Sequence, residues 1–229
     1  MKKFLALLAA LMLACTVACA ETAPDSVTVF VSISDDTGAL VLALEPVTVT
    51  DVDADGALTI YDALACAHAA NEIGADAFAA VQTEYGLSMA KLWGVENGGS
   101  YGYYLNNASA WSLLDPVTEG DHVKAYASTD LTTWSDTYSY FGADVVSAQV
   151  GAEVPLTLVA AGYDASYNPI TLPVEGAVLT VNGEATDLIT DAEGNVLFTT
   201  TEPGEYLISA SCETMNLVPP VCQLLVTAE

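Results

Sequence analysis

The sequence has very little positive charge. It holds no arginine and only four lysines against 30 acidic residues, which gives a formal net charge of −26 at pH 7. A surface this acidic repels phosphate backbones and anionic lipid headgroups, so nucleic acid and membrane surfaces are not expected partners. The same acidity attracts divalent cations, and it also keeps an exported protein soluble.

Groups that commonly perform catalysis are scarce as well. Two histidines occur, His68 and His122, and each is expected to have a structural or surface role. The sequence contains none of the G-x-S-x-G, H-E-x-x-H, C-x-x-C or phosphate-binding glycine motifs. Pairs of acids are abundant, but among so many acids their pairing carries little information. We therefore expect that the chain is not an enzyme.

Long apolar runs are missing except near the N-terminus. Two lysines precede an apolar stretch over 4–17, and Ala18–Ala20 supplies an A-x-A cleavage site. Residues 1–20 are therefore predicted to be a signal peptide, whose apolar stretch is too short for a membrane span. We expect a secreted, extracellular protein, with lipid anchoring to the cell surface through Cys19 as the alternative.

Three cysteines follow the predicted signal peptide. Cys66 lies among small residues in a predicted helix, where it is expected to behave as a small buried apolar group. Cys212 and Cys222 each lie beside a predicted strand. A disulfide between them would suit an exported protein, but sequence cannot supply the geometry, so the pairing stays open.

One acidic segment has the spacing of a calcium-binding loop. Over 51–62 the sequence reads DVDADGALTIYD, with carboxylates at loop positions 1, 3, 5 and 12 and glycine at position 6. Calcium takes six to eight oxygen ligands, and glycine permits the sharp turn that brings the first carboxylates together. The predicted calcium ligands are Asp51, Asp53, Asp55, Ala57 through its carbonyl, Thr59 directly or through water, and Asp62.

The last position departs from the usual pattern. Asp62 stands where such loops carry glutamate, and its shorter side chain predicts a weak site, with a dissociation constant of roughly 10⁻⁴ to 10⁻³ M. The loop resembles half of a dockerin repeat, although the chain holds no second copy. The alternative is an acidic turn whose aspartates only cap backbone amides.

The segments around this loop predict two strands followed by a helix. Alternating β-branched residues predict a strand over 26–34, and a turn at Asp35–Gly38 leads to a second strand over 39–50. Small and apolar residues at helical spacing predict a helix from Thr59 to about Asn71. The loop thus connects a strand to a helix, unlike a true EF-hand.

Aromatic residues concentrate between Asn97 and Phe141. Strands are predicted at the GYYLN segment, over 122–128 and over 132–141. Core and cross-strand packing explains most of these aromatics. A second interpretation is an exposed platform for a flat or sugar-like ligand, made by Tyr101, Tyr103 and Trp111.

The order of these segments resembles a known family. A hairpin, the DAL segment at Asp62–Leu64, the GYYLN strand and the EGD turn at Glu119–Asp121 are similar to the transcobalamin C-terminal-like domain of secreted bacterial proteins. The resemblance covers about 26–128 and implies a mixed or antiparallel sheet packed on one main helix. It also implies a link to corrinoid binding, which in that family is completed by a helical domain that this chain lacks.

The remainder of the chain shows short strands separated by turn signals. Strands are predicted over 154–160, 177–181, 196–200, 206–211 and 223–227. The segment TDAEGNVLFTTTEPGEYLISA resembles bacterial immunoglobulin-like modules, which implies a β-sandwich. The predicted organisation is a signal peptide over 1–20, an α+β domain over 21–144 and an all-β immunoglobulin-like sandwich over 145–229.

Two functions remain. The first is a secreted, non-catalytic, calcium-binding interaction or adhesion protein, with an extracellular protein or glycan as its partner. The second is a small-ligand capture protein that binds a corrinoid or glycan through the aromatic 101–111 region.

Overall fold

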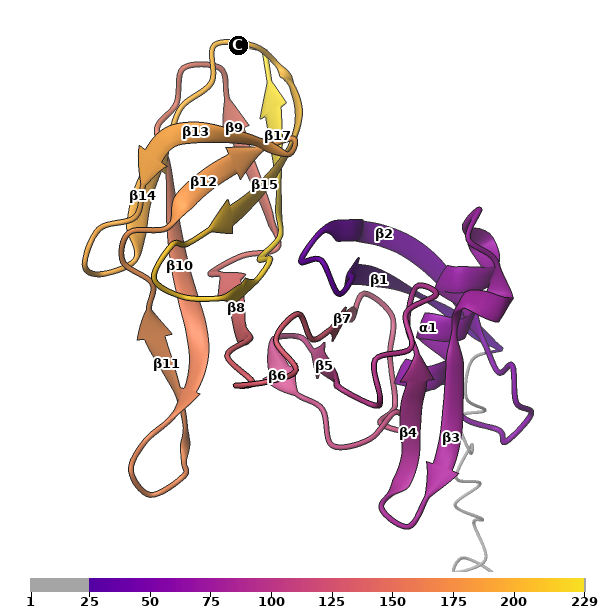
Figure 1. Cartoon of the computed structure of the whole chain (residues 1–229). Coiled ribbons are helices and arrows are strands. Elements are labelled where there is room, and N and C mark those ends of the chain that lie inside the picture. The colour runs from indigo at the N-terminus through magenta and orange to yellow at the C-terminus, as the bar shows by residue number, and fades with distance from the viewer. Residues whose placement is uncertain (1–24, 229) are drawn as a thin grey trace, which may run out of the picture.

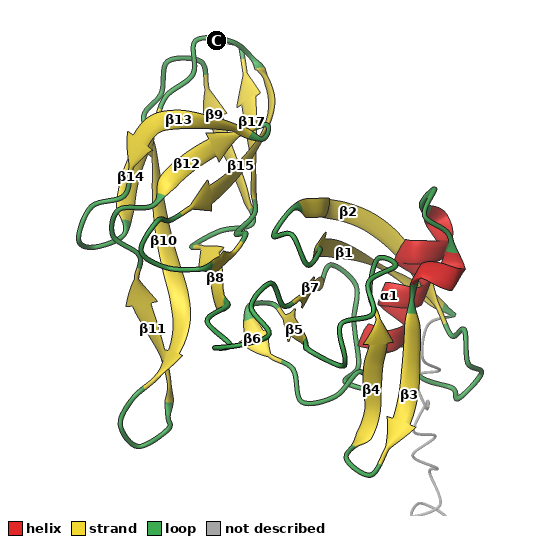
Figure 2. Cartoon of the chain, viewed as in Figure 1, coloured by secondary structure: helices red, strands yellow, loops and turns green. Residues whose placement is uncertain are grey.

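A computed structural model describes residues 25–228, so the predicted signal peptide and Cys19 lie outside the described residues. The predicted fold class, an α+β domain followed by a separate immunoglobulin-like sandwich, is wrong. The described residues form seventeen strands in several sheets and one α-helix (Figures 1 and 2). A single helix of 11 residues does not form a helical layer, and the chain is mostly β throughout its described length. The division of the chain at residues 144 and 145 stays a prediction.

The first sheet has the strand order β2-β1-β7-β5-β6. β1 and β2 form the expected antiparallel hairpin, whereas β7 lies parallel to β1 on its other side. The alternation of β-branched residues in β1 directs Val29 and Val31 into the core. The strands are β1 Ser26–Ser34, β2 Leu40–Thr50, β5 Tyr101–Leu105, β6 Ala108–Ser109 and β7 His122–Ala127.

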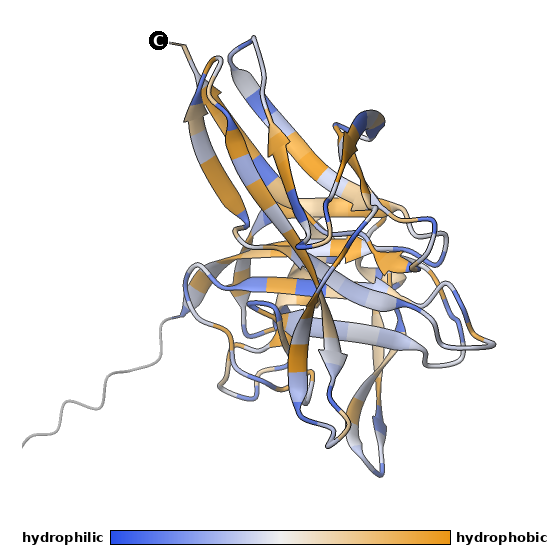
Figure 3. Cartoon of the chain, turned by 90° about the vertical axis from the view of Figure 1, so that its left-hand side faces the viewer, coloured by the Kyte–Doolittle hydropathy of each residue, from blue (hydrophilic) through white to orange (hydrophobic). Residues whose placement is uncertain are grey.

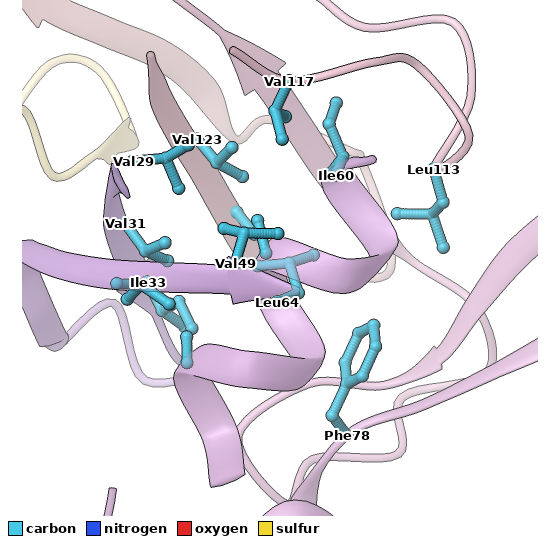
Figure 4. Close-up of a cluster of buried hydrophobic side chains, with 14 of the residues drawn as sticks. Val29, Val31, Ile33, Val49, Ile60, Leu64, Phe78, Leu113, Val117 and Val123 are labelled. Atoms are coloured by element: carbon cyan, nitrogen blue, oxygen red, sulfur yellow. The ribbon is translucent and has the colours of Figure 1, made fainter. Parts of the chain in front are cut away.

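Helix α1, Ile60–Ala70, covers one face of this sheet (Figure 4). Ile60, Leu64 and Ala67 recur on one side of the helix and are fully buried. They belong to the same core as Val29, Val31 and Val49. Removing a buried leucine side chain typically destabilises a protein by about 2–5 kcal/mol. This packing therefore fixes the first residue of α1 against the sheet, and with it the end of the acidic loop.

The segment after α1, for which the sequence analysis predicts no element, forms a short helix and a hairpin. A 3₁₀-helix at Ala75–Ala77 is followed by β3, Ala79–Thr83, and β4, Gly86–Lys91. Alanine and glycine have low strand propensity, so these strands carry no clear sequence pattern. Met89 and Leu92 nevertheless enter the first core.

The rest of the chain forms two further sheets that face each other across a second core. Their strand orders are β11-β10-β8-β16, with β14 paired to β10, and β13-β12-β15-β17-β9. Leu158 of β10 and Leu224 of β17 come from different sheets and are both fully buried in that core. Apolar and polar residues alternate along these strands (Figure 3). A β-sandwich of the immunoglobulin-like kind is therefore the part of the predicted resemblance that the architecture supports.

The strands of this region are β8 Thr137–Phe141, β9 Val145–Gln149, β10 Val154–Tyr163, β11 Pro169–Pro173, β12 Val178–Val181, β13 Glu184–Ile189, β14 Asn195–Phe198, β15 Gly204–Ser211, β16 Leu217–Val218 and β17 Cys222–Thr227. The predicted domain boundary at residues 144 and 145 places β8 in the first domain. β8 pairs instead with β10 and β16, because its side chain Phe141 is buried in the second core.

Two other features of the described residues bear on the predictions. No helix between residues 25 and 228 has both the length and the apolar character that crossing a membrane would require. Cys66, Cys212 and Cys222 are free thiols, so Cys212 and Cys222 do not form a disulfide.

Candidate functional site: an acidic loop between β2 and α1

The acidic loop brings three of the six predicted ligands together. Carboxylate oxygens of Asp51, Asp53 and Asp55 all lie within 4.8 Å of one another. Two residues with positive φ produce the turn, Ala54 at +60° and Gly56 at +89°. Glycine adopts this left-handed conformation without steric cost, whereas alanine is strained there. The loop therefore holds three negative side chains close together at the protein surface.

Backbone amides stabilise two of the three carboxylates. Asp51 Oδ1 accepts from Asp55 N at 3.2 Å, and its Oδ2 accepts from Gly56 N at 2.8 Å. Asp55 Oδ1 accepts from Ala57 N at 2.8 Å. The hydrogen bond from Gly56 is the main cause that lowers the pKa of Asp51. These bonds fix the loop, and each carboxylate oxygen keeps a free lone pair for another ligand.

Asp53 experiences the opposite effect. Asp53 is exposed, but desolvation by the surrounding loop, and then the charges of Asp55 and Asp62, raise the pKa of Asp53 above its ordinary value. The ionised form is disfavoured because neighbouring carboxylates repel it. A cation bound among the three carboxylates would remove this repulsion.

The last predicted ligand, Asp62, is not a member of this cluster of three. Its side chain is fully buried, and it accepts hydrogen bonds from Val52 N at 2.9 Å, Thr59 N at 2.9 Å and Thr59 Oγ1 at 2.7 Å. Thr59 in turn accepts from Asp62 N at 3.4 Å. This is a capping box that satisfies free amides at the start of α1. Thr59 and Asp62 are therefore engaged in starting the helix.

The protein supplies no cation to the loop. The lysines among the described residues, Lys91 and Lys124, form ion pairs with Glu96 and Asp144, and the sequence contains no arginine. Three clustered carboxylates fit a divalent cation, which prefers oxygen ligands. Three protein ligands are fewer than the six to eight that calcium takes, so water would complete the coordination and the affinity would be low.

The predicted aromatic platform is divided between the core and the surface. Tyr101 Oη donates to the carbonyls of Ala90 and Val95, each at 2.9 Å, and both Tyr101 and Tyr103 pack against the first core. Trp111 has 96% of its surface exposed. Because two of the three rings pack against the core, the structure does not present them as one exposed aromatic surface.

The two histidines are both buried. His68 is held in α1 by its contact with the carbonyl of Leu64, which lies 2.6 Å from Nδ1, while Trp93 N donates to Nε2 at 3.0 Å. Nδ1 therefore carries the proton. Burial lowers the pKa of His68, so its imidazole is neutral near pH 7. Both ring nitrogens of His68 are therefore bonded within the fold.

A polar cluster that sequence analysis missed surrounds the second histidine. His122 Nε2 lies 2.8 Å from Ser32 Oγ, and its Nδ1 lies 3.0 Å from Asp144 Oδ2 without the geometry of a hydrogen bond. Lys124 Nζ donates to Asp144 Oδ1 at 3.0 Å and to Asn107 Oδ1 at 2.7 Å. This cluster therefore links the first sheet to Asp144, which lies between β8 and β9.

The order serine, histidine, aspartate is that of a hydrolase triad, but this cluster lacks what a nucleophile requires. Ser32 has only 4% of its surface exposed, and its Oγ also accepts from Leu44 N at 2.9 Å. A substrate carbonyl cannot approach an oxygen enclosed in this way. The cluster is therefore structural, since it satisfies buried polar groups where the two parts of the chain meet.

The electrostatics of the cluster agree with this role. Burial lowers the pKa of His122, which favours its neutral form. Burial alone would raise the pKa of Asp144, but contact with His122 and the charge of Lys124 outweigh that effect and hold it at about 2. Asp144 is thus an anion, and Lys124 is its cation.

Comparisons with known proteins add little. No model of a known protein family matches the chain, and no curated protein matches it. The solved structures that match include the N-terminal four immunoglobulin domains of Dscam1 isoforms 6.9, 4.44 and 7.44, at 9%, 12% and 10% identity with TM-scores of 0.25, 0.27 and 0.27.

These matches cover 48%, 65% and 88% of this chain but only 23%, 32% and 46% of the Dscam1 chains, so the chain spans less than half the length of each. Such TM-scores are too low to establish a common fold or function. No family match supports the resemblance to transcobalamin-like or dockerin-like proteins.

Proposed function

We propose that this chain is a secreted, non-catalytic interaction protein that binds one calcium ion in the loop between β2 and α1. The observation that carries the proposal is the convergence of Asp51, Asp53 and Asp55, whose carboxylate oxygens lie within 4.8 Å of one another. The raised pKa of Asp53 supports it, because after desolvation its causes are the charges of Asp55 and Asp62, a repulsion that a bound cation would relieve.

Calcium would act on stability and geometry. The loop joins the end of β2, at Thr50, to the capping box of α1. A cation held by three aspartates would rigidify this connection, and the exposed surface of the sheets would remain available for a partner outside the cell. Secretion is proposed from the N-terminal sequence pattern, and an interaction role from the β-sandwich and the lack of catalytic groups.

The test is calorimetric titration of calcium into chelator-treated protein, compared with Asp53→Ala. The expected result is a one-site isotherm that the substitution abolishes. Asp36→Ala is the matched control, since Asp36 is an exposed aspartate in the turn between β1 and β2 and its loss changes the net charge equally. An isotherm that is unchanged in Asp53→Ala would place calcium elsewhere and refute the assignment.

A further inference from the structure

A second candidate site lies where the start of β5, the end of β7 and the turn before β8 meet. A pocket of about 290 Å³ opens there, and its lining includes Ser100, Tyr126, Ser128, Trp134 and Asp136. This volume is at the small end of the range for ligand pockets. The pocket shares no residue with the acidic loop. Of the predicted aromatic platform it includes Tyr101, whose hydroxyl is bonded to the carbonyls of Ala90 and Val95, but neither Tyr103 nor Trp111.

Trp134 is held outside the core by an ordered turn. Its side chain is 65% exposed, and its φ is +58°, a conformation that is strained for a bulky residue. Asp130 fixes the turn by accepting from Thr132 N at 2.9 Å, Thr133 N at 3.0 Å and Ser135 Oγ at 2.7 Å. A large aromatic side chain is thus presented to solvent by a turn with defined geometry, which is a recurring feature of binding sites.

Tyr126 supplies a second aromatic group with an equally fixed position. It lies directly across from Gly102 in the neighbouring strand. A Cβ atom on Gly102 would stand 2.2 Å from the ring carbons of Tyr126, so the ring occupies the space that the glycine leaves. Burial first, and the nearby charge of Asp136 among smaller causes, raise the pKa of the Tyr126 hydroxyl, so the phenol stays neutral.

The charge at this pocket is negative and has no cationic partner among the described residues. Asp136 accepts from Thr129 N at 2.9 Å, Thr129 Oγ1 at 2.8 Å and Asp130 N at 2.9 Å. These bonds position the carboxylate but do not cancel its charge. Lys91 and Lys124 are both paired elsewhere. In a chain with a net charge of −26, the pocket therefore attracts a cation and repels an anion.

The lining determines which kind of cation fits. A hard metal ion requires several free oxygen ligands, whereas Asp136 is the only carboxylate in the lining and already accepts three hydrogen bonds. The faces of tryptophan and tyrosine rings carry partial negative charge and attract weakly hydrated organic cations. We propose that this pocket binds a trimethylammonium group, with its methyl groups against Trp134 and Tyr126 and its charge beside Asp136.

The test uses choline chloride as the probe on the purified protein, in the presence of a calcium chelator so that the acidic loop does not contribute. Binding is followed by calorimetry and by tryptophan fluorescence. We expect saturable binding that weakens roughly 10-fold in Trp134→Ala, the size typical of a cation–π contact. Trp111→Ala is the matched control, because it removes another exposed tryptophan and should leave choline binding unchanged.

Two comparisons make the test specific. The neutral alcohol 3,3-dimethylbutan-1-ol has the shape of choline without its charge, and it should not bind. A trimethylammonium group occurs both in small solutes and in lipid headgroups. Binding to vesicles of phosphatidylcholine, compared with vesicles of phosphatidylglycerol, distinguishes these two sources. Binding of free choline alone indicates a small solute, and binding of phosphatidylcholine vesicles as well indicates a lipid headgroup.

Three results would overturn the proposal. The first is no heat or fluorescence change up to ~50 mM choline, well above the micromolar to millimolar constants of specific small-ligand sites. The second is equal binding of the neutral alcohol, and the third is unchanged choline binding by a Trp134→Ala variant that melts like the wild type.

Discussion

The sharpest structural prediction concerns Asp62, which the sequence assigns to calcium and the structure assigns to the start of α1. Asp62→Ala removes an acceptor that serves Val52 N, Thr59 N and Thr59 Oγ1. Val52 is 47% exposed, so water can replace its lost partner, whereas Thr59 is 2% exposed. The Thr59 amide is therefore left buried without a hydrogen bond.

The magnitude follows from these contacts. An unsatisfied buried donor costs about 1–3 kcal/mol, and loss of a helix cap adds about 1 kcal/mol. The expected loss in the free energy of unfolding is therefore about 2–4 kcal/mol, or roughly 4–16 °C in melting temperature for a chain of this size. The loss should be the same with calcium and with chelator, because none of these contacts involves the metal.

The loss of stability is measured by differential scanning calorimetry of Asp62→Ala and Asp53→Ala, each with calcium and with chelator. Asp53 belongs to the exposed cluster, so its removal should lower the melting temperature only when calcium is present. The reasoning would be refuted if Asp62→Ala matched the wild type in chelator and lost stability only in calcium. Asp62 would then be a metal ligand and its cap a secondary feature.

Three further predictions follow from other buried groups. Because burial lowers the pKa of His68 and His122, the unfolded chain takes up protons below pH ~6.5 that the folded chain does not. The melting temperature should therefore fall as the pH is lowered from 6.5 to 5, and it should fall less steeply in His122→Gln. A melting temperature that rises over this range would contradict the prediction. Gly102→Ala places a Cβ 2.2 Å from the Tyr126 ring and should cost about 1–3 kcal/mol in urea unfolding; Tyr126→Ala in the same chain should recover part of the loss, and additive losses would argue against the clash. Lys124→Met leaves Asp144 without its cation and should lower the free energy of unfolding, measured thermally, by about 2–4 kcal/mol. This is at the low end for buried ion pairs, because the Asp144 side chain is 28% exposed. A variant as stable as the wild type would show that the pair contributes nothing.

The sequence predicted those parts of the fold that depend on local patterns. Alternation, turn residues and helical spacing predicted several elements close to their observed positions. These are β1, β2, α1 with Thr59 before it, and most strands after Val154. The hairpin of β3 and β4 was missed because alanine-rich strands lack such a pattern. The predicted strand over 132–141 begins only at Thr137, because Asp130 and Asp136 stabilise turns in the residues before it.

Long-range pairing could not be obtained from local patterns. The parallel pairing of β1 with β7 brings Ser32 and His122 together across 90 positions of sequence. No pattern of neighbouring residues predicts this pairing. The same holds for the pocket between Tyr126 and Trp134. In the acidic loop, spacing predicted four converging carboxylates, of which Asp51, Asp53 and Asp55 come together, but it could not show that Asp62 is part of the helix cap.

The most direct test of the calcium proposal is the melting temperature of the chelator-treated protein as calcium is added. A ligand that binds only the folded state at ten times its dissociation constant adds about 1.4 kcal/mol, which corresponds to roughly 3–6 °C for a protein of this size. We predict a rise of this size when calcium reaches ten times a dissociation constant of roughly 10⁻⁴ to 10⁻³ M, absent in Asp53→Ala. A melting temperature that does not change up to ~10 mM calcium, ten times the weaker limit, would contradict the proposal and leave residues 51–55 as an acidic turn.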